Sequence, residues 1–174
     1  MKGRLTGLPI QQRTVLIVGE GHAEVIFLQY CKGLFVTRNS GLRIKISNAH
    51  GKGAGHVVDH AIGQSRVAAR DACYALLDED TDWTPAVQKR AKSKKVQVLL
   101  AEPCLEALLL QVHDQAVFGK ATQQLKTQFK NYFDGAAAND ATLYDKRFDR
   151  NTLNLAAQRI ALLESILTIF QSSK

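Results

Sequence analysis

The sequence predicts an α/β fold in which helices flank a mainly parallel, four-stranded sheet. Four short apolar segments alternate with longer segments whose apolar residues recur at helical spacing. Three of the four apolar segments are followed within two residues by an acidic residue. Strands that alternate with helices imply crossover connections, and these connections join parallel strands.

The four predicted strands differ in the environment that their sequences indicate. Residues 14–18 (TVLIV) form a largely β-branched run before Gly-Glu-Gly, which is typical of a buried strand. Residues 42–47 (LRIKIS) alternate apolar and basic side chains, so this strand should expose one face and lie near a sheet edge. Residues 73–77 (CYALL) lead directly into Asp78-Glu79-Asp80, and residues 96–100 (VQVLL) form the fourth strand.

Helices are predicted between and after these strands. The first covers residues 23–34, the second about 56–70, after a glycine-rich turn, and the third about 84–94, because Thr84-Pro85 suits a helix start. A fourth begins at Pro103 or Cys104 and continues through Leu110. Beyond it we expect a helix from residue 115 or 120 to 132, a loop at 135–140 and one long amphipathic helix over about 152–170. We therefore divide the chain into an α/β domain, residues 1–115, and a helical extension packed on it, residues 116–174.

Composition excludes several classes of protein. The 174 residues are 45% hydrophobic and 22% charged, which is ordinary for a globular protein, and no apolar run reaches the roughly 18–20 residues that a membrane helix needs. The first thirteen residues lack the apolar core of a secretory signal, so we expect a cytoplasmic protein. Cys31, Cys73 and Cys104 are widely spaced and odd in number, which favours buried thiols over disulfides.

The charges are unevenly distributed. Lys and Arg number 23 against 16 Asp and Glu, a net charge of +7, so the protein should attract anions such as nucleic acid. Eight of the sixteen acidic residues nevertheless fall within three short windows, at positions 20–24, 78–82 and 102–106. Half of the carboxylates of this basic protein therefore follow the ends of three predicted strands.

Those three windows should meet at one edge of the sheet, because ligands of open parallel sheets bind at the carboxyl ends of the strands. Two unmatched carboxylates about 4 Å apart repel by about 4 kcal/mol at an effective dielectric near 20. A divalent cation such as Mg²⁺ or Mn²⁺ would offset this repulsion, and a proton shared between the acids is the alternative. Mg²⁺ held by carboxylates in a basic protein indicates phosphate-ester chemistry.

Several other features have two interpretations. Gly51-Lys52-Gly53-Ala54-Gly55 lacks the order of a phosphate-binding P-loop, but Lys52 and the backbone amides could contact a phosphate. The basic cluster at residues 89–95 is either a nucleic-acid contact or, more commonly, a solvated helix face. Trp83 either stacks on a base or packs at a domain edge. We interpret Cys104 as a packing residue.

The acidic motifs resemble those of the TOPRIM domain, a Rossmann-like parallel-sheet catalytic module. Val18-Gly19-Glu20-Gly21 matches its glutamate after the first strand, and Leu77-Asp78-Glu79-Asp80 matches its DxD after the third. Within that family the chain is most similar to RloB-like proteins of prokaryotic restriction and phage-defence loci. The likeness there lies in Glu20-Gly21-His22-Ala23-Glu24 and in Pro103-Cys104-Leu105-Glu106, the start of a leucine-rich helix.

The resemblance implies a Mg²⁺-dependent nuclease, with Glu20 as general acid and base and Asp78 and Asp80 as metal ligands. Glu20 and Glu106 are further candidate ligands, and Lys52, Gly21 and Glu24 are candidate substrate-binding residues. RloB-like genes often accompany an ATPase gene, which makes an ATPase a candidate partner besides nucleic acid. Two alternatives stay open: a catalytically silent nucleic-acid-binding subunit of an ATPase complex, and a phosphatase or nucleotidyl enzyme that acts on small molecules.

Overall fold

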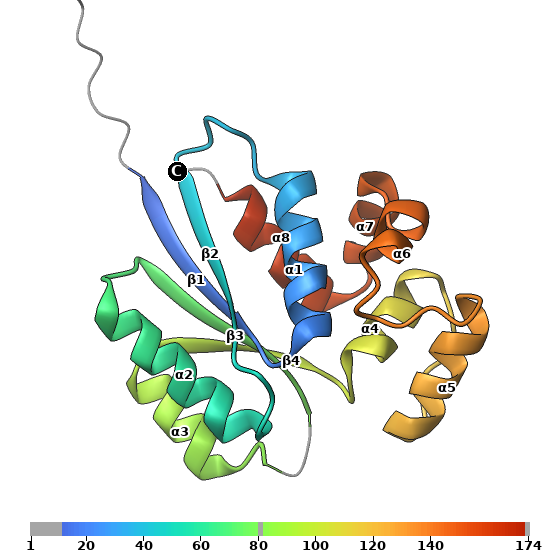
Figure 1. The fold of residues 1–174 in the computed structure, drawn as a ribbon, viewed down its shortest axis with the longest axis horizontal. Coiled ribbons are helices and arrows are strands. Elements are labelled where there is room, and N and C mark those ends of the chain that lie inside the picture. The colour runs from blue at the N-terminus through green and yellow to red at the C-terminus, as the bar shows by residue number, and fades with distance from the viewer. Residues whose placement is uncertain (1–11, 80–81, 173–174) are drawn as a thin grey trace, which may run out of the picture.

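Four parallel strands form the centre of the molecule in a computed structural model that describes residues 12–79 and 82–172 (Figure 1). They are β1 (Arg13–Gly19), β2 (Leu42–Asn48), β3 (Ala72–Asp78) and β4 (Val96–Ala101), in the order β2-β1-β3-β4. The predicted α/β class with a four-stranded parallel sheet is confirmed. β2, whose sequence alternates apolar and basic residues, forms one edge of the sheet as expected.

The register aligns the carboxyl ends of the strands. Gly19 at the end of β1 pairs with Asn48 of β2 and with Leu76 of β3, and Asp78 pairs with Ala101 at the end of β4. β1 is buried on both faces along its apolar run, residues 15–18. Loops that follow different strands therefore emerge next to one another at one edge of the molecule.

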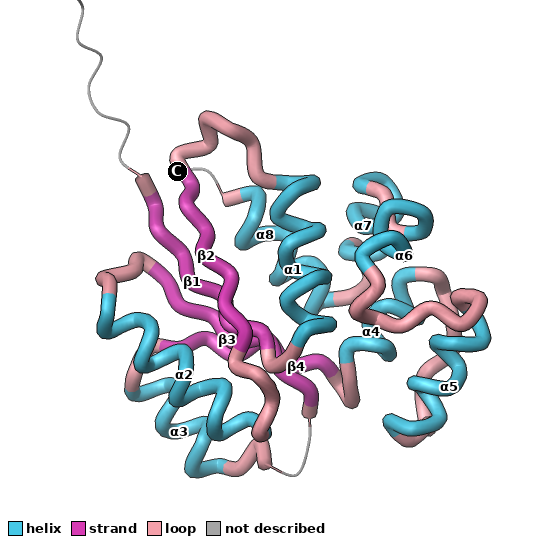
Figure 2. The backbone as a smooth tube through the Cα atoms, in the orientation of Figure 1, coloured by secondary structure: helices cyan, strands magenta, loops and turns pink. Residues whose placement is uncertain are grey.

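Helices cover both faces of the sheet (Figure 2). On one face α1 (His22–Phe35) packs with α8 (Ala161–Gln171), and on the other α2 (Gly53–Val67) packs with α3 (Pro85–Ser93). Because side chains alternate along a strand, β1 contributes to a separate core on each side of the sheet. Val15 and Ile17 face α1, whereas Leu16 and Val18 face α2.

The remaining helices lie together beside α1 (Figure 1). They are α4 (Leu105–Val112), α5 (Thr122–Tyr132), α6 (Ala141–Arg147) and α7 (Arg150–Ala157). Tyr144 of α6 is fully buried, its hydroxyl donates to the carbonyl of Ala138 at 2.6 Å, and its ring lies 5.9 Å from that of Phe27 in α1. Aromatic packing therefore attaches this helical group to the sheet domain, in one core shared with α1.

The expected single helix over residues 152–170 is wrong. The chain forms α7 and α8 with a break at residues 158–160, and the apolar Leu155 of α7 is 55% exposed. Arg159 in the break donates to the carbonyls of Gln111 and Val112 at 3.0 and 3.1 Å and pairs with Asp114 at 2.7 Å. The turn thus satisfies the carbonyl end of α4, and it lets α8 fold back onto the sheet.

Two expectations from composition can be compared with the structure. Cys31, Cys73 and Cys104 are free and buried, as expected. Over residues 12–79 and 82–172, none of the helices combines the length and apolar character needed to cross a membrane.

Candidate functional site

The strand order creates a crevice at the carboxyl ends of β1 and β3. From β1 the chain passes to β2 on one side of it, while β3 lies on the other side and leads on to β4. The connections after β1 and β3 therefore diverge onto opposite faces of the sheet. This divergence is where open α/β sheets bind their ligands.

Glu20 lies in this crevice, directly after β1. Its backbone N–H donates to the carbonyl of Leu76 at 3.0 Å, and its side-chain Oε2 accepts from the N–H of Asp78 at 3.1 Å. Both backbone and side chain of Glu20 are thus bonded to β3. The first two acidic windows of the sequence come into direct contact through these bonds.

Glu24 is the one buried charged residue of the described chain, 7% exposed, in the first turn of α1. Its Oε2 accepts from the N–H of Gly21 at 2.8 Å. A Cβ on Gly19 would lie 3.0 Å from the Cβ of Glu24 and from a methyl group of Val25. Glycine at position 19 therefore allows α1 to begin directly over the end of β1, which places Glu24 beside Glu20.

Asp78, the last residue of β3, connects the crevice to α4. Its Oδ1 accepts from the N–H of Leu105, the first residue of α4, at 2.9 Å. Glu106 is the next residue of that helix, so the third acidic window approaches the first two through this bond. Cys104, which precedes α4, is fully buried, and burial raises the pKa of its thiol to about 12, consistent with a packing role.

The carboxyl groups lie close enough to shift one another's pKa. Burial is the largest cause of the rise in the pKa of Asp78 to about 7, and the negative charges of Glu24, Glu106 and Glu20 add to it, while the bond from Leu105 opposes it. Burial likewise raises the pKa of Glu24, with a contribution from Glu106. Four carboxyl groups from β1, α1, β3 and α4 therefore form one electrostatic cluster, hereafter the acidic cluster.

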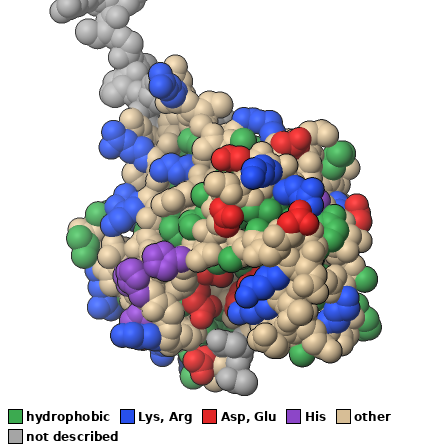
Figure 3. Space-filling model, turned by 45° about the vertical axis from the view of Figure 1, so that its right-hand side comes forward, with side chains coloured by type: hydrophobic (Ala, Val, Ile, Leu, Met, Phe, Trp, Pro, Cys, Tyr) green, Lys and Arg blue, Asp and Glu red, His purple; other side chains and the backbone are tan. Residues whose placement is uncertain are grey.

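A basic residue that the sequence did not indicate lies near this cluster. The positive charge of Lys126, on α5, acts against the rise in the pKa of Glu24. Figure 3 shows acidic side chains around a hollow, with Lys or Arg side chains on one side of it and histidines on the other. Lys126 follows Glu24 by about a hundred positions, so no local sequence pattern could have indicated it.

Histidines gather after β1 and β2. The rings of His22 and His50 are 6.3 Å apart, centroid to centroid. His56 and His60 of α2 are bonded locally, to the carbonyl of Ala49 and to the hydroxyl of Ser47, each at 3.0 Å. Both histidines of this i, i+4 pair thus have local structural partners.

The glycine-rich turn that holds Lys52 is attached to the acidic crevice. Gly51 donates its N–H to the carbonyl of Glu20 at 2.8 Å, and Lys52 is the exposed N-cap residue of α2. The N–H of Gly21 is bonded to Glu24, so Gly21 contributes by orienting Glu24. The candidate substrate-binding residues Gly21 and Lys52 are thus next in sequence to residues of these bonds, Glu20 and Gly51, and Glu24 is bonded to Gly21.

The predicted metal ligand Asp80 lies outside the described residues. Glu102 is exposed and lines a different cavity, beside Leu108 and Arg159. Among residues 12–79 and 82–172, no three His, Cys, Asp or Glu side chains are arranged to hold a metal ion. The donor chemistry nevertheless suits Mg²⁺ or Mn²⁺, because four carboxyl groups offer oxygen ligands and excess negative charge. Burial and neighbouring negative charges raise the pKa values of two of them, Asp78 and Glu24.

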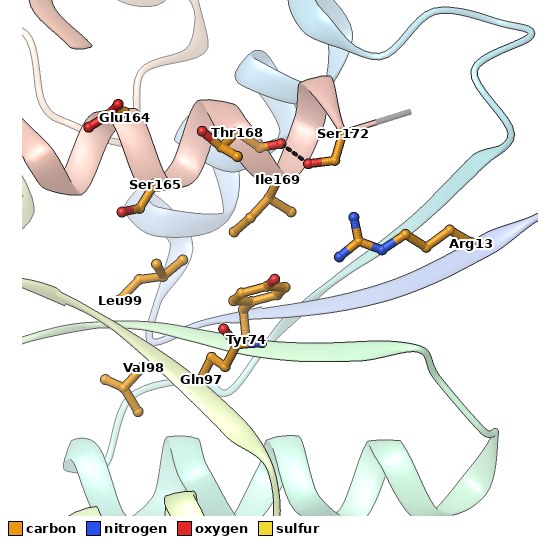
Figure 4. A pocket seen from close by; sticks show the side chains of 10 residues that line it. All are labelled: Arg13, Tyr74, Gln97, Val98, Leu99, Glu164, Ser165, Thr168, Ile169 and Ser172. Atoms are coloured by element: carbon orange, nitrogen blue, oxygen red, sulfur yellow. Dashed lines mark hydrogen bonds between the residues drawn. The ribbon is translucent and has the colours of Figure 1, made fainter. Parts of the chain in front are cut away.

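A cavity of about 510 Å³ lies between α8 and the sheet, away from the acidic cluster (Figure 4). It lies near the start of β1, with Arg13, and the end of α8, with Ser172, whose hydroxyl donates to the carbonyl of Thr168. Tyr74 and Gln97 point into it from the sheet. None of the predicted site residues lines this cavity, so it does not contribute to the candidate site.

The fold and the cluster together define an α/β protein with a cluster of acidic residues at the divergence point of a parallel sheet. A comparison of the chain with family models, curated proteins and solved structures finds no match in any of the three. The functional argument therefore rests on the chemistry of the site.

The turn at residues 50–53 allows a direct stability test. Gly53 has φ +82°, and a Cβ there would collide with the carboxylate of Asp82. We expect Gly53→Ala to lower the free energy of unfolding by about 1–2 kcal/mol, because alanine is disfavoured in the left-handed region. The matched control is Gly63→Ala, in the same helix with open space around it, which should stabilise by about 0.4–1 kcal/mol. Urea denaturation measures both, and equal effects of the two replacements would contradict this account.

Proposed function

We propose that this protein is a Mg²⁺- or Mn²⁺-dependent nuclease that hydrolyses phosphodiester bonds of DNA or RNA in the cytoplasm. The observation that carries the proposal is the acidic cluster, in which Asp78 has a pKa raised to about 7 among Glu20, Glu24 and Glu106. Strongly perturbed carboxyl groups in a crevice favour a functional site over a structural one.

Charge and motif likeness support the same proposal. The net charge of +7 attracts a polyanion to a protein in which four of the sixteen acidic residues form the acidic cluster. The residues of the cluster are those through which the sequence resembles TOPRIM domains and the RloB-like proteins of phage-defence loci. Glu20 and Asp78 occupy the positions that this resemblance assigns to the general acid and base and to a metal ligand.

The residues divide the chemistry between them. Asp78, Glu106 and Glu20, together with Asp80, would hold the cation, which when bound stabilises the attacking and leaving oxygens of the phosphate. Glu20 is hydrogen-bonded to the backbone of Asp78, so a proton carried by its carboxyl group is held next to that phosphate. The bond from Gly21 orients Glu24, and Lys52, the N-cap residue of α2, would contact a substrate phosphate.

A cleavage assay tests the proposal. Labelled DNA and RNA, single- and double-stranded, are incubated with the purified protein and Mg²⁺, Mn²⁺ or EDTA. We expect metal-dependent cutting of at least one polymer and no turnover of mononucleotides. Salt-sensitive binding without cutting would instead support a regulatory subunit that works with an ATPase. Turnover of mononucleotides alone would support a small-molecule phosphatase.

A further inference from the structure

A second surface, on α3 and the edge strand β4, has the chemistry of a nucleic-acid contact. A groove of about 390 Å³ is lined there by apolar Trp83, Val96 and Val98 and by polar side chains. Two of the latter are Lys92 and Lys95, both exposed. β4 has no neighbouring strand on this side, so the groove opens along the sheet edge.

The charge of this segment is of one sign. Residues 83–101 contain five basic residues and no acidic one. Arg90 is engaged, pairing with Asp59 at 2.9 Å and donating to the carbonyl of Gly55. The four lysines make no ion pair with any described residue and remain exposed to solvent: Lys89, Lys92, Lys94 and Lys95. A solvated helix face would commonly mix both signs, whereas this one complements a polyanion.

Trp83 makes the groove suited to one kind of polyanion. Its side chain is half-buried against the core beneath α3, and it lines the groove together with the half-buried Val98 of β4. An aromatic face flanked by lysines binds single-stranded nucleic acid, because unpaired bases stack on the ring while the lysines contact the phosphates. The bases of a duplex are already stacked on one another and cannot use this surface.

The position of Trp83 links the groove to the acidic cluster. Trp83 follows Asp78 by five residues, in the connection from β3 to α3, so their Cα atoms lie at most about 17 Å apart. A strand that stacks on Trp83 therefore approaches the carboxyl ends of β1 and β3. Trp83 is thus the part of the groove nearer to the acidic cluster, whereas Lys95 and Val96 lie at the start of β4.

We propose that the groove formed by Trp83, Val96, Val98, Lys92 and Lys95 binds single-stranded nucleic acid and leads it to the acidic cluster. The second half of this statement rests on the proposed nuclease function, but binding in the groove requires no turnover. Binding can therefore be tested with metal removed, and its outcome is independent of whether the protein cuts.

Trp83 is the single tryptophan of the chain, so its fluorescence reports on the groove alone. In EDTA, a thymidine DNA oligomer of about 12 nucleotides should quench this emission, since a stacked base quenches the indole. Lys92→Gln/Lys95→Gln retains the reporter and should reduce the slope of log affinity against log salt by about 1.4, because two phosphate contacts are lost. The charge-matched control is Arg38→Gln/Arg43→Gln, which should leave the affinity unchanged. Both residues are exposed: Arg38 precedes β2 and Arg43 lies on β2, the edge strand opposite β4.

Anisotropy of the labelled oligomer provides the second readout. Trp83→Ala should weaken binding about 5- to 150-fold, the range for loss of one base stack, whereas Trp83→Phe should retain most of the affinity. Circular dichroism melts confirm that each variant is folded.

Three results would overturn the proposal. The first is binding by anisotropy without quenching of Trp83, and the second is a control pair as damaging as the lysine pair. The third is equal quenching by a duplex or by a polyglutamate peptide. Quenching of Trp83 without any cleavage of the substrate would support binding in the groove and reject the proposed nuclease function.

Discussion

Asp78→Asn is expected to lower the rate of metal-dependent cleavage by about a thousandfold or more, the upper range for loss of a single electrostatic group at a reacting centre. Asp78 lies at the centre of the acidic cluster, in contact with Glu20 through its backbone and with α4 through its side chain. Asparagine has the same shape and can still accept the hydrogen bond from Leu105. The replacement therefore removes the charge without removing the connection between β3 and α4.

The neighbouring residue provides the matched control. Glu79 is exposed, and its backbone N–H donates to the carbonyl of Ala101, so its side chain lies outside the cluster. Glu79→Gln also removes one negative charge, at the residue after Asp78, and should leave the cleavage rate within a few-fold of that of the wild type. Single-turnover kinetics at saturating Mg²⁺ compare the two. Comparable rates for Asp78→Asn and Glu79→Gln would reject a catalytic role for the cluster.

The same replacement is expected to stabilise the protein when metal is absent. The folded-state pKa of Asp78 is raised to about 7 from a usual value of 3.8, chiefly by burial. Below pH 3.8 the group is protonated in both the folded and the unfolded states and has no effect on stability. As the pH rises from 3.8 to about 7 only the unfolded state releases the proton freely, so the free energy of unfolding falls. The loss is complete above pH 7 and amounts to at most about 4 kcal/mol.

Asp78→Asn should therefore raise the free energy of unfolding by up to about 4 kcal/mol at pH 8 and change it little at pH 4. Urea denaturation in EDTA at both pH values measures the difference, with Glu79→Gln as the control for a general change in net charge. Mg²⁺ at pH 8 should reduce the difference in free energy of unfolding between Asp78→Asn and the wild type, because it stabilises the wild type selectively. An equal increase in the free energy of unfolding at pH 4 and pH 8 would show that the buried charge of Asp78 does not cause the increase.

A gain in stability on removal of a carboxylate is a common signature of a functional site. Carboxyl groups that lie close together to bind a ligand repel one another when the ligand is absent. This repulsion lowers the stability of the folded state locally. Glu24 is a second example, because burial raises the pKa of its carboxyl group, while backbone hydrogen bonds from Glu24 itself and Gly21 and the charge of Lys126 oppose the rise.

Much of the site could be predicted from local sequence. Glu20 and Asp78 directly follow apolar runs, and an apolar run followed by glycine or acid marks where a strand ends. Once the strands are parallel their carboxyl ends share one edge, so both residues are expected at that edge, whereas their direct contact depends on β1 lying next to β3. Glu106 joined them because its helix begins shortly after the fourth strand.

Other contacts could not be predicted, because they connect segments with no local relation. Lys126 reaches the vicinity of Glu24 through the packing of α5 against α4, and Glu102, in the same acidic window as Glu106, turns toward Arg159 instead. The groove beside Trp83 depends on β4 forming an edge, which the alternation of strands and helices does not specify.

The sequence by itself determined the α/β class, the four strands, the edge position of β2 and the gathering of Glu20 and Asp78, since each depends on periodicity or on the end of a strand. Tertiary structure alone decided the strand order, the break between α7 and α8, and the neighbours that raise the pKa of Asp78. Residues 152–170 contain no glycine or proline, so nothing local interrupts their helical pattern. Arg159 reaches the carbonyl end of α4 only when α8 lies on the sheet, and a break of that kind comes from distant partners rather than from propensity.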